Sequence, residues 1–336
     1  MDAEGPYLVI PTRRGTVPTL TLAQANDILA PAERVVATSV FDAMDFVKPC
    51  AESGMSLSEF CGLRGYKTVL TLRSSFQGAH TSAASSDAAV AGDNEKGRAV
   101  ISIDKWSEVV RATRPAIAVE LHESVPLSEP LSKRRRVAAT RSETWHAKAE
   151  TLPELGCELM PSISVGGIHT AGFIDAVPRN ENAFEFFSAL QTLKLGTGGP
   201  SMCVVHSVSA LMAAMLANVT LIECPLPWVL AEKGLAIVFP LCCGSDGDTE
   251  AVMPLLDFND NIFALDIRPI SSSCPCFTCT RHNRAYLHHL LTVQEMNSDI
   301  LLSIHNLSQV VRLVRAYRCA NAKERDSLVR QVLSVL

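Results

Sequence analysis

Short runs of aliphatic and β-branched residues recur along this 336-residue chain, separated by longer segments with helical spacing. Several runs are apolar throughout, which is typical of strands buried on both faces of a parallel sheet. Strands are predicted at 7–10, 35–38, 68–72, 99–103, 116–121, 162–165, 202–206, 220–224 and 236–241, and helices at 22–29, 107–114, 130–152, 182–194 and 209–217. This alternation predicts an α/β fold, a (β/α)₈ barrel of the TIM type. A doubly wound open sheet is the main alternative, but no GxGxxG motif follows a strand to support it.

The composition is that of a globular chain with a sizeable core, since 47% of the residues are hydrophobic and 19% are charged. The net charge is −5, whereas proteins that bind nucleic acid mainly by charge are usually basic. Any RNA contact must therefore come from a local patch or from a partner. Residues 1–6 lack the basic start and apolar stretch of a signal peptide, and no run is long enough for a membrane span. The expected setting is a reducing intracellular compartment.

Three cysteines lie within six residues of one another in Cys274-Pro-Cys276-Phe-Thr-Cys279. This spacing suits a tetrahedral Zn²⁺ site, and a fourth ligand is available among the histidines that follow, His282, His288, His289 and His305. The other eight cysteines are scattered or lie in apolar runs, so we interpret them as core residues. A disulfide is the alternative, but nothing in the sequence indicates an oxidising compartment. We therefore predict a structural zinc.

The C-terminal part is predicted to be mostly helical, with apolar residues at helical spacing in 281–302, 305–319 and 323–336. The cysteine cluster would then begin a small helical subdomain that a zinc ion holds together. We predict two domains: a barrel over residues 1–270, and a zinc-binding helical subdomain over 271–336 that completes it. Within the barrel, the Ser-, Ala- and Gly-rich stretch 77–97 predicts a flexible surface loop.

The segment CPCFTCTRHNRAYLHHLL that starts at Cys274, with the later LLSIHNL, closely resembles the zinc-binding region of tRNA-guanine transglycosylases. In that family a CxCxxC run precedes an RAY-[IL]-HHLL helix, and a later HN supplies the histidine. The resemblance implies that Cys274, Cys276, Cys279 and His305 hold one structural Zn²⁺ per subunit. It extends more weakly to residues 13–18, 161–167 and 221–239. It implies a (β/α)₈ barrel with a zinc subdomain near the C-terminal end.

Catalytic members of this family exchange a guanine in tRNA for another base. The chemistry needs a carboxylate nucleophile at the ribose C1′ and a second Asp as general acid and base. The resemblance places Glu223 at the nucleophile position, Thr220 at the first Asp of the same motif, and Leu72 at the general-base position. Leucine cannot move a proton. The extra methylene of Glu displaces the attacking oxygen by roughly an ångström, an error that can cost about a hundredfold in rate.

Other positions depart from the family pattern in the same direction. The base-recognising Asp appears as His122, the Gln before Gly166-Gly167 appears as Val165, and the PTR motif that grips the anticodon loop is replaced by Pro-Trp-Val at 227–229. The loss of so many polar groups indicates a pocket that is no longer built for a purine. We therefore predict no catalytic residue, although Asp45 or Asp87 could in principle replace the missing acid at Leu72.

The sequence is thus most similar to the non-catalytic accessory subunits of eukaryotic queuine tRNA-ribosyltransferases. This resemblance implies a heterodimer with a catalytic subunit, near whose interface the zinc region lies. It implies exchange of guanine for queuine at the wobble position of GUN-anticodon tRNAs, in queuosine biosynthesis, with this chain helping to hold the tRNA. It also implies a cytoplasmic location with peripheral contact to the mitochondrial outer membrane. Two alternatives stay open: a divergent but active transglycosylase that uses Glu223, and an unrelated zinc-stabilised barrel.

Two basic stretches bear on RNA contact. The run Lys133-Arg-Arg-Arg136, with Arg141, is interpreted as a solvated helix face in preference to a phosphate contact or a nuclear signal. Arg312, Arg315 and Arg318 recur every three residues, as a stripe facing RNA phosphates or as plain surface charge. Trp228 and Phe239 are predicted to pack in the core or at a dimer interface.

Overall fold

The computed structural model describes residues 5–77, 85–94, 96–123, 133–163, 171–174, 183–193, 195, 199–239 and 255–333. The chain divides into two compact units, one of residues 1–17 with 31–224 and one of residues 18–30 with 225–336. These bounds differ from the predicted domains 1–270 and 271–336, and that assignment stays a prediction. Within the described residues, none of the helices combines the length and the apolar character that a bilayer crossing requires.

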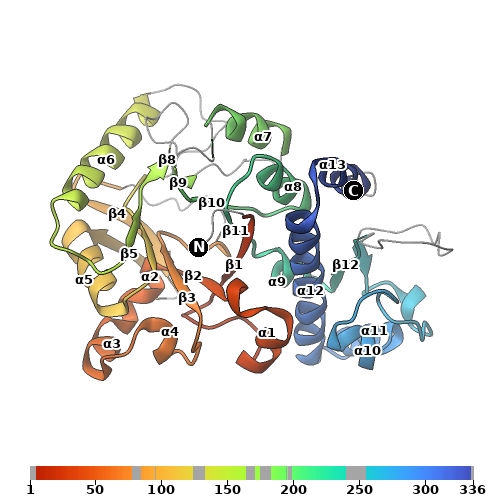
Figure 1. The fold of residues 1–336 in the computed structure, drawn as a ribbon. Coiled ribbons are helices and arrows are strands. Elements are labelled where there is room, and N and C mark those ends of the chain that lie inside the picture. The colour runs from red at the N-terminus through yellow and green to blue at the C-terminus, as the bar shows by residue number, and fades with distance from the viewer. Residues whose placement is uncertain are drawn as a thin grey trace. The chain divides into compact units, whose positions relative to one another are not determined.

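The first unit is a parallel β-barrel ringed by helices (Figure 1). Its strands are β1 (Tyr7–Pro11), β2 (Val35–Ser39), β3 (Lys67–Thr71), β6 (Ile117–Val119), β7 (Glu158–Met160), β8 (Ser162–Ile163), β9 (Gly172–Ile174), β10 (Ser201–Val204) and β11 (Leu221–Glu223). They pair in the order β7-β6-β3-β2-β1-β11-β10-β9-β8. Only Pro161 separates β7 from β8, so these are two halves of one bent strand, and the chain itself closes the ring. The predicted (β/α)₈ barrel is confirmed.

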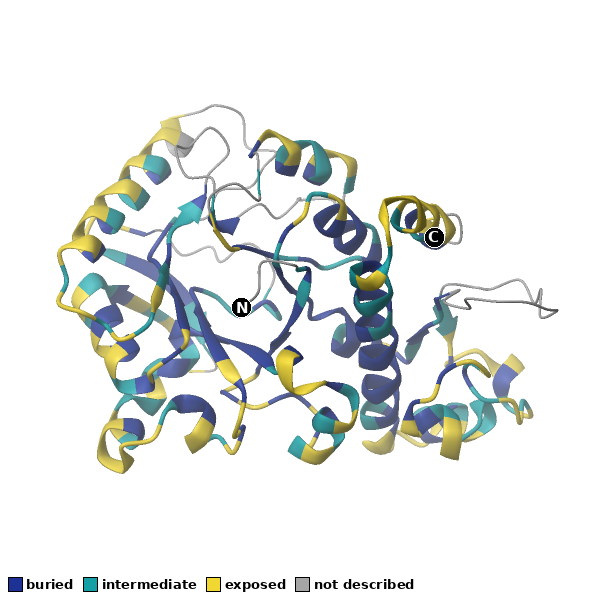
Figure 2. Cartoon of the chain, viewed as in Figure 1, coloured by how far each residue is buried: buried dark blue, intermediate teal, exposed yellow. Residues whose placement is uncertain are grey.

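The barrel interior is filled by side chains that all come from the strands. Alternate residues of a strand point to opposite faces, so one set fills the interior and the other faces the helices. The interior set consists of Val9, Val35, Ala37, Val69, Ile117, Val119, Met160, Phe173, Met202 and Leu221. Both sets are buried, which is why the strands appear in the sequence as continuous apolar runs rather than as alternating ones. Figure 2 shows the strands as the most deeply buried part of this unit.

Helices pack on the outer face of the strands. They are α2 (Val40–Ala43), α3 (Val47–Ser53), α4 (Leu57–Phe60), α5 (Ile103–Thr113), α6 (Lys133–Glu150), α7 (Ala183–Thr192) and α8 (Val208–Leu216), with 3₁₀ turns at η1 (Pro31–Glu33) and η2 (Met44–Phe46). Trp106 of α5 and Trp145 of α6 are almost fully buried and join Leu70 of β3 in one outer core. Side chains of this size bury enough apolar area to anchor each helix on the sheet.

The structure corrects the predicted arrangement around residues 77–103. The strand predicted at 99–103 is β5 (Gly97–Ser102), which pairs antiparallel with β4 (Ala89–Asn94) outside the barrel. The surface loop predicted for 77–97 therefore includes a β-strand, although residues 78–84 and 95 lie outside the described part. Gly92 of β4 leaves room for the Phe41 ring, because a Cβ there would collide with it. The short strands β7 and β9 were not predicted.

The second unit contains a β-hairpin and several helices around a long helix. Its elements are α1 (Leu22–Ile28), α9 (Leu226–Ala231), β12 (Leu235–Ile237), β13 (Leu255–Asp257), η3 (Asn261–Phe263), α10 (Phe277–Arg281), α11 (Arg284–Thr292), α12 (Asn297–Cys319) and α13 (Ala322–Leu333). The strand predicted at 236–241 is therefore β12 of this hairpin rather than a barrel strand. Most of α12 is buried (Figure 2). The helix predicted over 281–302 is broken, because Gln294 has a φ of 56° and separates α11 from α12.

Candidate functional site

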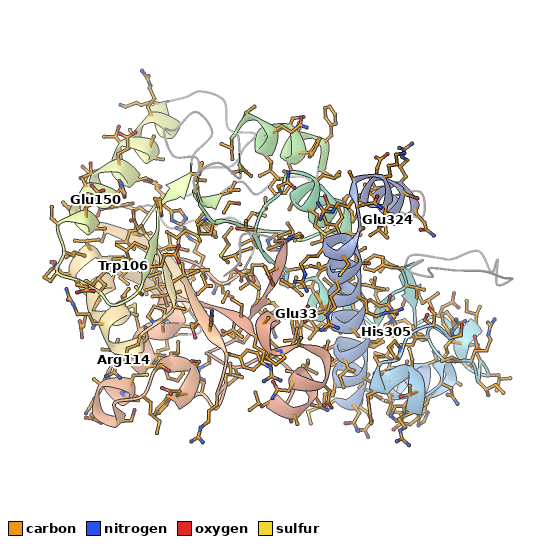
Figure 3. The ribbon with its side chains drawn as sticks, viewed as in Figure 1. Glu33, Trp106, Arg114, Glu150, His305 and Glu324 are labelled. Carbon is orange, nitrogen blue, oxygen red and sulfur yellow. The ribbon has the colours of Figure 1, made fainter. Side chains whose placement is uncertain are left out.

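Four residues predicted to bind a metal come together in the second unit. Cys274 precedes α10, Cys276 and Cys279 lie at its start and within it, and His305 projects from the middle of α12 (Figure 3). The three Sγ atoms and one imidazole nitrogen all lie within 4.8 Å of one another. Cys274, Cys276 and His305 are buried, and Cys279 is partly buried. No other described residues form a group of this kind.

The His305 ring is oriented by the backbone of the neighbouring hairpin. Its Nε2 donates to the carbonyl oxygen of Ile237 at 2.8 Å. Its Nδ1 therefore faces the thiols, and it lies 3.2 Å from Cys279 Sγ and 3.6 Å from Cys276 Sγ. A metal-binding histidine commonly donates its second nitrogen to a carbonyl in this way, which selects the tautomer and raises the basicity of the ligand.

The next residue, Asn306, fastens the same hairpin. Its Oδ1 accepts from the Ile237 amide at 2.8 Å, and its Nδ2 donates to the carbonyl oxygens of Leu235 and Pro227 at 2.9 and 3.1 Å. The His-Asn pair thus has two roles: one side chain faces the thiols, and the other satisfies buried backbone groups of β12 and α9. The sequence marked this pair as a motif, but gave no role for Asn306.

The donor set and spacing fit Zn²⁺. Bond lengths of about 2.3 Å to sulfur and 2.0–2.1 Å to nitrogen in a tetrahedron place sulfur and nitrogen about 3.6 Å apart, close to the two distances from Nδ1. The Cys279 amide also donates to Cys276 Sγ at 3.4 Å, which favours a thiolate there. Three cysteines and one histidine would complete four-coordination with protein atoms alone, the arrangement of structural rather than catalytic zinc.

The electrostatics of the cluster favour a bound cation. Hydrogen bonds from Cys276 and Cys279 lower the pKa of the Cys274 thiol. Burial by itself would lower the pKa of His305, but the hydrogen bonds and negative charge of Cys274 and Cys276 outweigh it and raise that pKa to about 9. A site that draws a proton onto a buried imidazole is electronegative, and a divalent metal supplies the missing positive charge.

A second group of contacts holds residues 266–270, the loop that precedes the cluster in the sequence. The Arg284 guanidinium donates to the carbonyl oxygens of Pro269 and Ile270 at 2.8 and 3.0 Å and pairs with Asp266 at 3.1 Å. Arg268 also pairs with Asp266, and it is the main cause of the low pKa of that carboxyl group. These contacts assign a positioning role to the arginine of the RAYLHHLL motif, which the sequence alone left without one.

An apolar surface lies on the segments around this loop. Leu265, Ile267 and Ile262 are 90%, 80% and 72% exposed. Backbone hydrogen bonds tie residues 266 and 268 to the first turn of α11, where the Tyr286 ring stacks on His282 with centroids 5.1 Å apart. The His282 ring in turn meets the half-exposed Phe277 ring edge-on at 5.6 Å. Side chains of this size are seldom left exposed together unless they meet a partner.

In the first unit, Glu223 ends β11 at the carboxyl edge of the barrel strands, where TIM barrels carry their active sites. It is in register with Val9 of β1 and Val204 of β10, and it is almost fully buried. Burial raises its pKa to about 7, and the nearby Ser75 hydroxyl acts in the opposite direction. Yet neither Glu223 Oε2 nor Ser75 Oγ has a hydrogen-bond partner among the described residues.

At the end of β3, Leu72 places an apolar side chain at the position that the resemblance gives to the general base. Leu72 is buried in the outer core with Leu70, Phe41 and Trp106, on the side of the strand that faces the helices. His122 is buried, donates a hydrogen bond from Nδ1 to the Glu120 carbonyl oxygen at 2.9 Å, and packs against the Phe173 ring. Asp45 and Asp87, the two possible substitutes, are engaged in ion pairs with Lys96 and Arg141.

The remaining predicted residues have structural surroundings or lie outside the described part. The Thr220 hydroxyl accepts a hydrogen bond from the Ser201 amide and donates one to the Ser201 carbonyl oxygen, both at 2.7 Å. Trp228 is buried and donates to the Pro18 carbonyl oxygen at 2.8 Å, and Phe239 is buried as well. Arg315, one of the three arginines predicted to form a stripe, donates to the Ile28 carbonyl oxygen at 2.7 Å. It therefore binds a carbonyl oxygen at the C-terminal end of α1. Val165 and Gly166-Gly167 lie outside the described residues.

Comparison with known proteins gives one consistent result. Residues 174–329 match the family model described as queuine tRNA-ribosyltransferase. A relative from Trichoplax adhaerens, named queuine tRNA-ribosyltransferase accessory subunit 2, is 24% identical over 94% of this chain and 88% of its own length. One from Culex quinquefasciatus with the same name is 23% identical over 93% of this chain and 80% of its own.

A shorter match connects the chain to a differently named relative. The queuine tRNA-ribosyltransferase of Thermosynechococcus vestitus is 35% identical over 34% of this chain and 27% of its own length. The full-length matches therefore carry the accessory-subunit name, while this local match reaches a protein named for the transferase itself. Together with the barrel and the Cys₃His cluster, these matches make the chain similar to queuine tRNA-ribosyltransferases and their accessory subunits over most of its length.

Proposed function

We propose that this chain is the non-catalytic subunit of a heterodimeric queuine tRNA-ribosyltransferase. It pairs with a catalytic subunit and helps to hold GUN-anticodon tRNA while guanine is exchanged for queuine at the wobble position. The observation that carries this proposal is that relatives matching over most of the chain are named accessory subunits. The apolar Leu72, at the position that the resemblance gives to the general base, supports the same proposal.

The chemistry of base exchange explains why the strand ends matter. The nucleophile must attack ionised, and a second group must take and return a proton at the base. Glu223 is buried without a charged partner, and burial raises its pKa. Leu72 lies in the outer core, and its aliphatic side chain cannot take or return a proton. A carboxyl group in such surroundings tends to hold its proton, and a protonated carboxyl group is a poor nucleophile.

We further propose that Cys274, Cys276, Cys279 and His305 bind one Zn²⁺ as a structural ion. With four protein ligands, the ion has no open position for water or substrate. Bound there, it would join α10 to α12 and, through His305, to β12. This zinc would therefore shape the surface around α11 rather than take part in chemistry.

The apolar surface of Ile262, Leu265, Ile267, Phe277 and Tyr286 is proposed as the contact for the catalytic subunit. To test this, Leu265 and Ile267 would both be changed to Asp, and pairing measured by analytical ultracentrifugation. Two charges in a desolvated contact should weaken pairing by at least about a hundredfold, since a buried unpaired charge costs several kcal/mol. Val100→Asp, at an exposed position of β5, is the control and should pair normally. Unchanged pairing of the double variant would place the contact elsewhere.

The second candidate function is an active transglycosylase that uses Glu223, because its carboxyl group ends β11 with an oxygen that no described residue binds. Exchange of labelled guanine into GUN-anticodon tRNA separates the two. The chain would be assayed alone and together with a catalytic subunit from the same source. We expect activity only in the mixture, unchanged by Glu223→Gln. Activity of the chain alone that Glu223→Gln abolishes would establish the second function.

A further inference from the structure

The first turn of α6 carries positive charge that does not stabilise the helix. Residues 133–136 are all Lys or Arg, and the first acidic residue of the helix is Glu143. Cations at a helix N-terminus meet the positive end of the macrodipole, which costs about 0.3–1 kcal/mol each at an exposed site. A run placed against the dipole is better explained by an external anion than by the stability of the helix.

A groove runs along the same end of α6. Its volume is about 680 Å³, and its lining includes Lys133, Arg136, Thr140, Arg141, Thr144 and Asp87. Lys133 and Arg136 are exposed, and no described residue forms an ion pair with either of them. Ammonium, guanidinium and hydroxyl groups in one groove are the donors that proteins use for phosphate oxygens.

Arg141 holds the groove in place and compensates its acidic members. Its Nε pairs with Asp87 at 2.7 Å and its Nη1 with Glu123 at 2.8 Å. Trp145 adds a hydrogen bond from Nε1 to the Asp87 carbonyl oxygen at 3.3 Å. Lys133, Arg136 and Arg141 outnumber the carboxylates of Asp87 and Glu123 by one.

The groove lies on the functional side of the barrel. The helix of a β/α unit begins near the carboxyl end of the preceding strand, so the first turn of α6 belongs to the face where Glu223 ends β11. Because the whole chain has a net charge of −5, a polyanion requires a local positive patch such as this one. The sequence alone favoured a solvated helix face, and it is the groove that changes this interpretation.

We propose that the groove at the start of α6 binds phosphates of the tRNA backbone, with Lys133 and Arg136 as the contacting side chains. This inference rests on the proposed function, because it assumes that the heterodimer holds tRNA. To the proposed function it adds the surface with which this chain contacts the tRNA. The contact reads charge and not base sequence, so it should act equally on tRNAs with different anticodons.

The test is tRNA binding by the heterodimer with Lys133 and Arg136 both changed to Glu. Binding of labelled GUN-anticodon tRNA would be measured by fluorescence anisotropy between 50 and 200 mM salt. Each phosphate contact adds about 0.9 to the log–log salt slope, so losing two should lower the slope by about two. At 100 mM salt we expect an affinity loss of at least about tenfold. A tRNA with another anticodon should lose affinity by the same factor.

A matched control uses Arg64 and Lys67, which have the same residue types and spacing but precede or begin β3, at the opposite end of the strands. Changing both to Glu alters the net charge equally and should leave tRNA affinity within about twofold. The melting temperature of the Lys133→Glu, Arg136→Glu variant should stay equal or rise, since acids suit a helix N-terminus. Reduced binding with undiminished stability rules out unfolding as the cause.

The outcomes separate this inference from the proposed function. Normal tRNA binding by the Lys133→Glu, Arg136→Glu heterodimer overturns the inference alone. An equal loss in the control variant also overturns it, because the effect would then reflect net charge. If the unaltered heterodimer binds no tRNA, the proposed function fails, and the inference fails with it.

Discussion

The cysteine cluster and the strand ends of the barrel treat buried polar atoms in opposite ways. At the cluster, His305 has a backbone acceptor at one nitrogen and two thiols at the other, and Asn306 makes three backbone hydrogen bonds. At the barrel, Glu223 Oε2 and Ser75 Oγ are buried without a partner among the described residues. Both places are buried, so burial does not explain the difference.

The difference indicates which of the two sites is still built for a task. A buried polar group without a partner costs about 1–3 kcal/mol in stability. The cluster provides orientation, spacing and charge for one ion. At the strand ends, Glu223 provides a carboxyl group, whereas Leu72, at the position that the resemblance gives to the general base, is apolar. A subunit that keeps its scaffold and loses its chemistry would have this pattern.

The largest expected effect is at the cluster. Cys276→Ala should abolish metal binding and unfold the second unit, because structural zinc contributes about 10–16 kcal/mol in small zinc domains. Zinc content by mass spectrometry and resistance to proteolysis would be measured together. Cys319→Ala, at the exposed end of the same α12, should keep the full metal content and stability. A metal-free Cys276→Ala protein that resists proteolysis as the unaltered chain does would refute the structural role.

The next effect is at Asn306. Replacing it by Ala leaves the Ile237 amide and the Leu235 and Pro227 carbonyl oxygens without their partner. At about 1–3 kcal/mol for each orphaned group, partly relieved by water, we expect a loss of roughly 3–5 kcal/mol in the free energy of unfolding. Asn297→Ala, at the exposed start of α12, should change this free energy by less than about 0.5 kcal/mol. Denaturant unfolding monitored by circular dichroism measures both.

The two sites also differ in how well the sequence predicted them. Cys274, Cys276 and Cys279 lie within six residues of one another, and only His305 is distant in the sequence. Because few spacings of cysteine and histidine suit a tetrahedral metal ion, the sequence pattern alone identified these four residues. The barrel was predicted from its apolar runs, except for β7 and β9, which are only three residues long and show no clear pattern. The strand at 99–103 was misplaced because a β-hairpin outside the barrel has the same β-branched composition as a barrel strand.

Some features could not be predicted because they depend on which face a side chain occupies. Leu72 lies in the outer core with side chains of the helices, a placement that the sequence did not indicate. A shift of one residue along a strand exchanges the two faces, and a sequence without aligned relatives does not define that register. The role of Arg141 depends on Asp87 and Glu123, which are distant in sequence, so only the fold brings this group together.

A smaller effect is expected at Glu223, with a dependence on pH. Its pKa rises from 4.5 to about 7 on folding, so the folded chain binds this proton more tightly than the unfolded chain. The contribution of protonated Glu223 to the free energy of unfolding should therefore be fully present below pH 4.5 and be lost as the pH rises through about 7. At pH 8 the free energy of unfolding should be lower by about 3 kcal/mol. Glu223→Gln should remove this decline and stabilise the chain at pH 8 but not at pH 4.5. Equal pH profiles of the two proteins would contradict the buried, unpartnered carboxyl group.

The smallest effect is expected at Ser75. Its hydroxyl lowers the pKa of Glu223, so Ser75→Ala should raise that pKa further and move the stability decline to higher pH. At low pH the change should be neutral within about 1 kcal/mol, because Glu223 is then protonated and has no charge for the hydroxyl to stabilise. Ser74→Ala, one residue away, is the control and should leave the pH of the decline unchanged. A large loss of stability at pH 4.5 in Ser75→Ala would show that this hydroxyl is bound after all, and the contrast between the two sites would narrow.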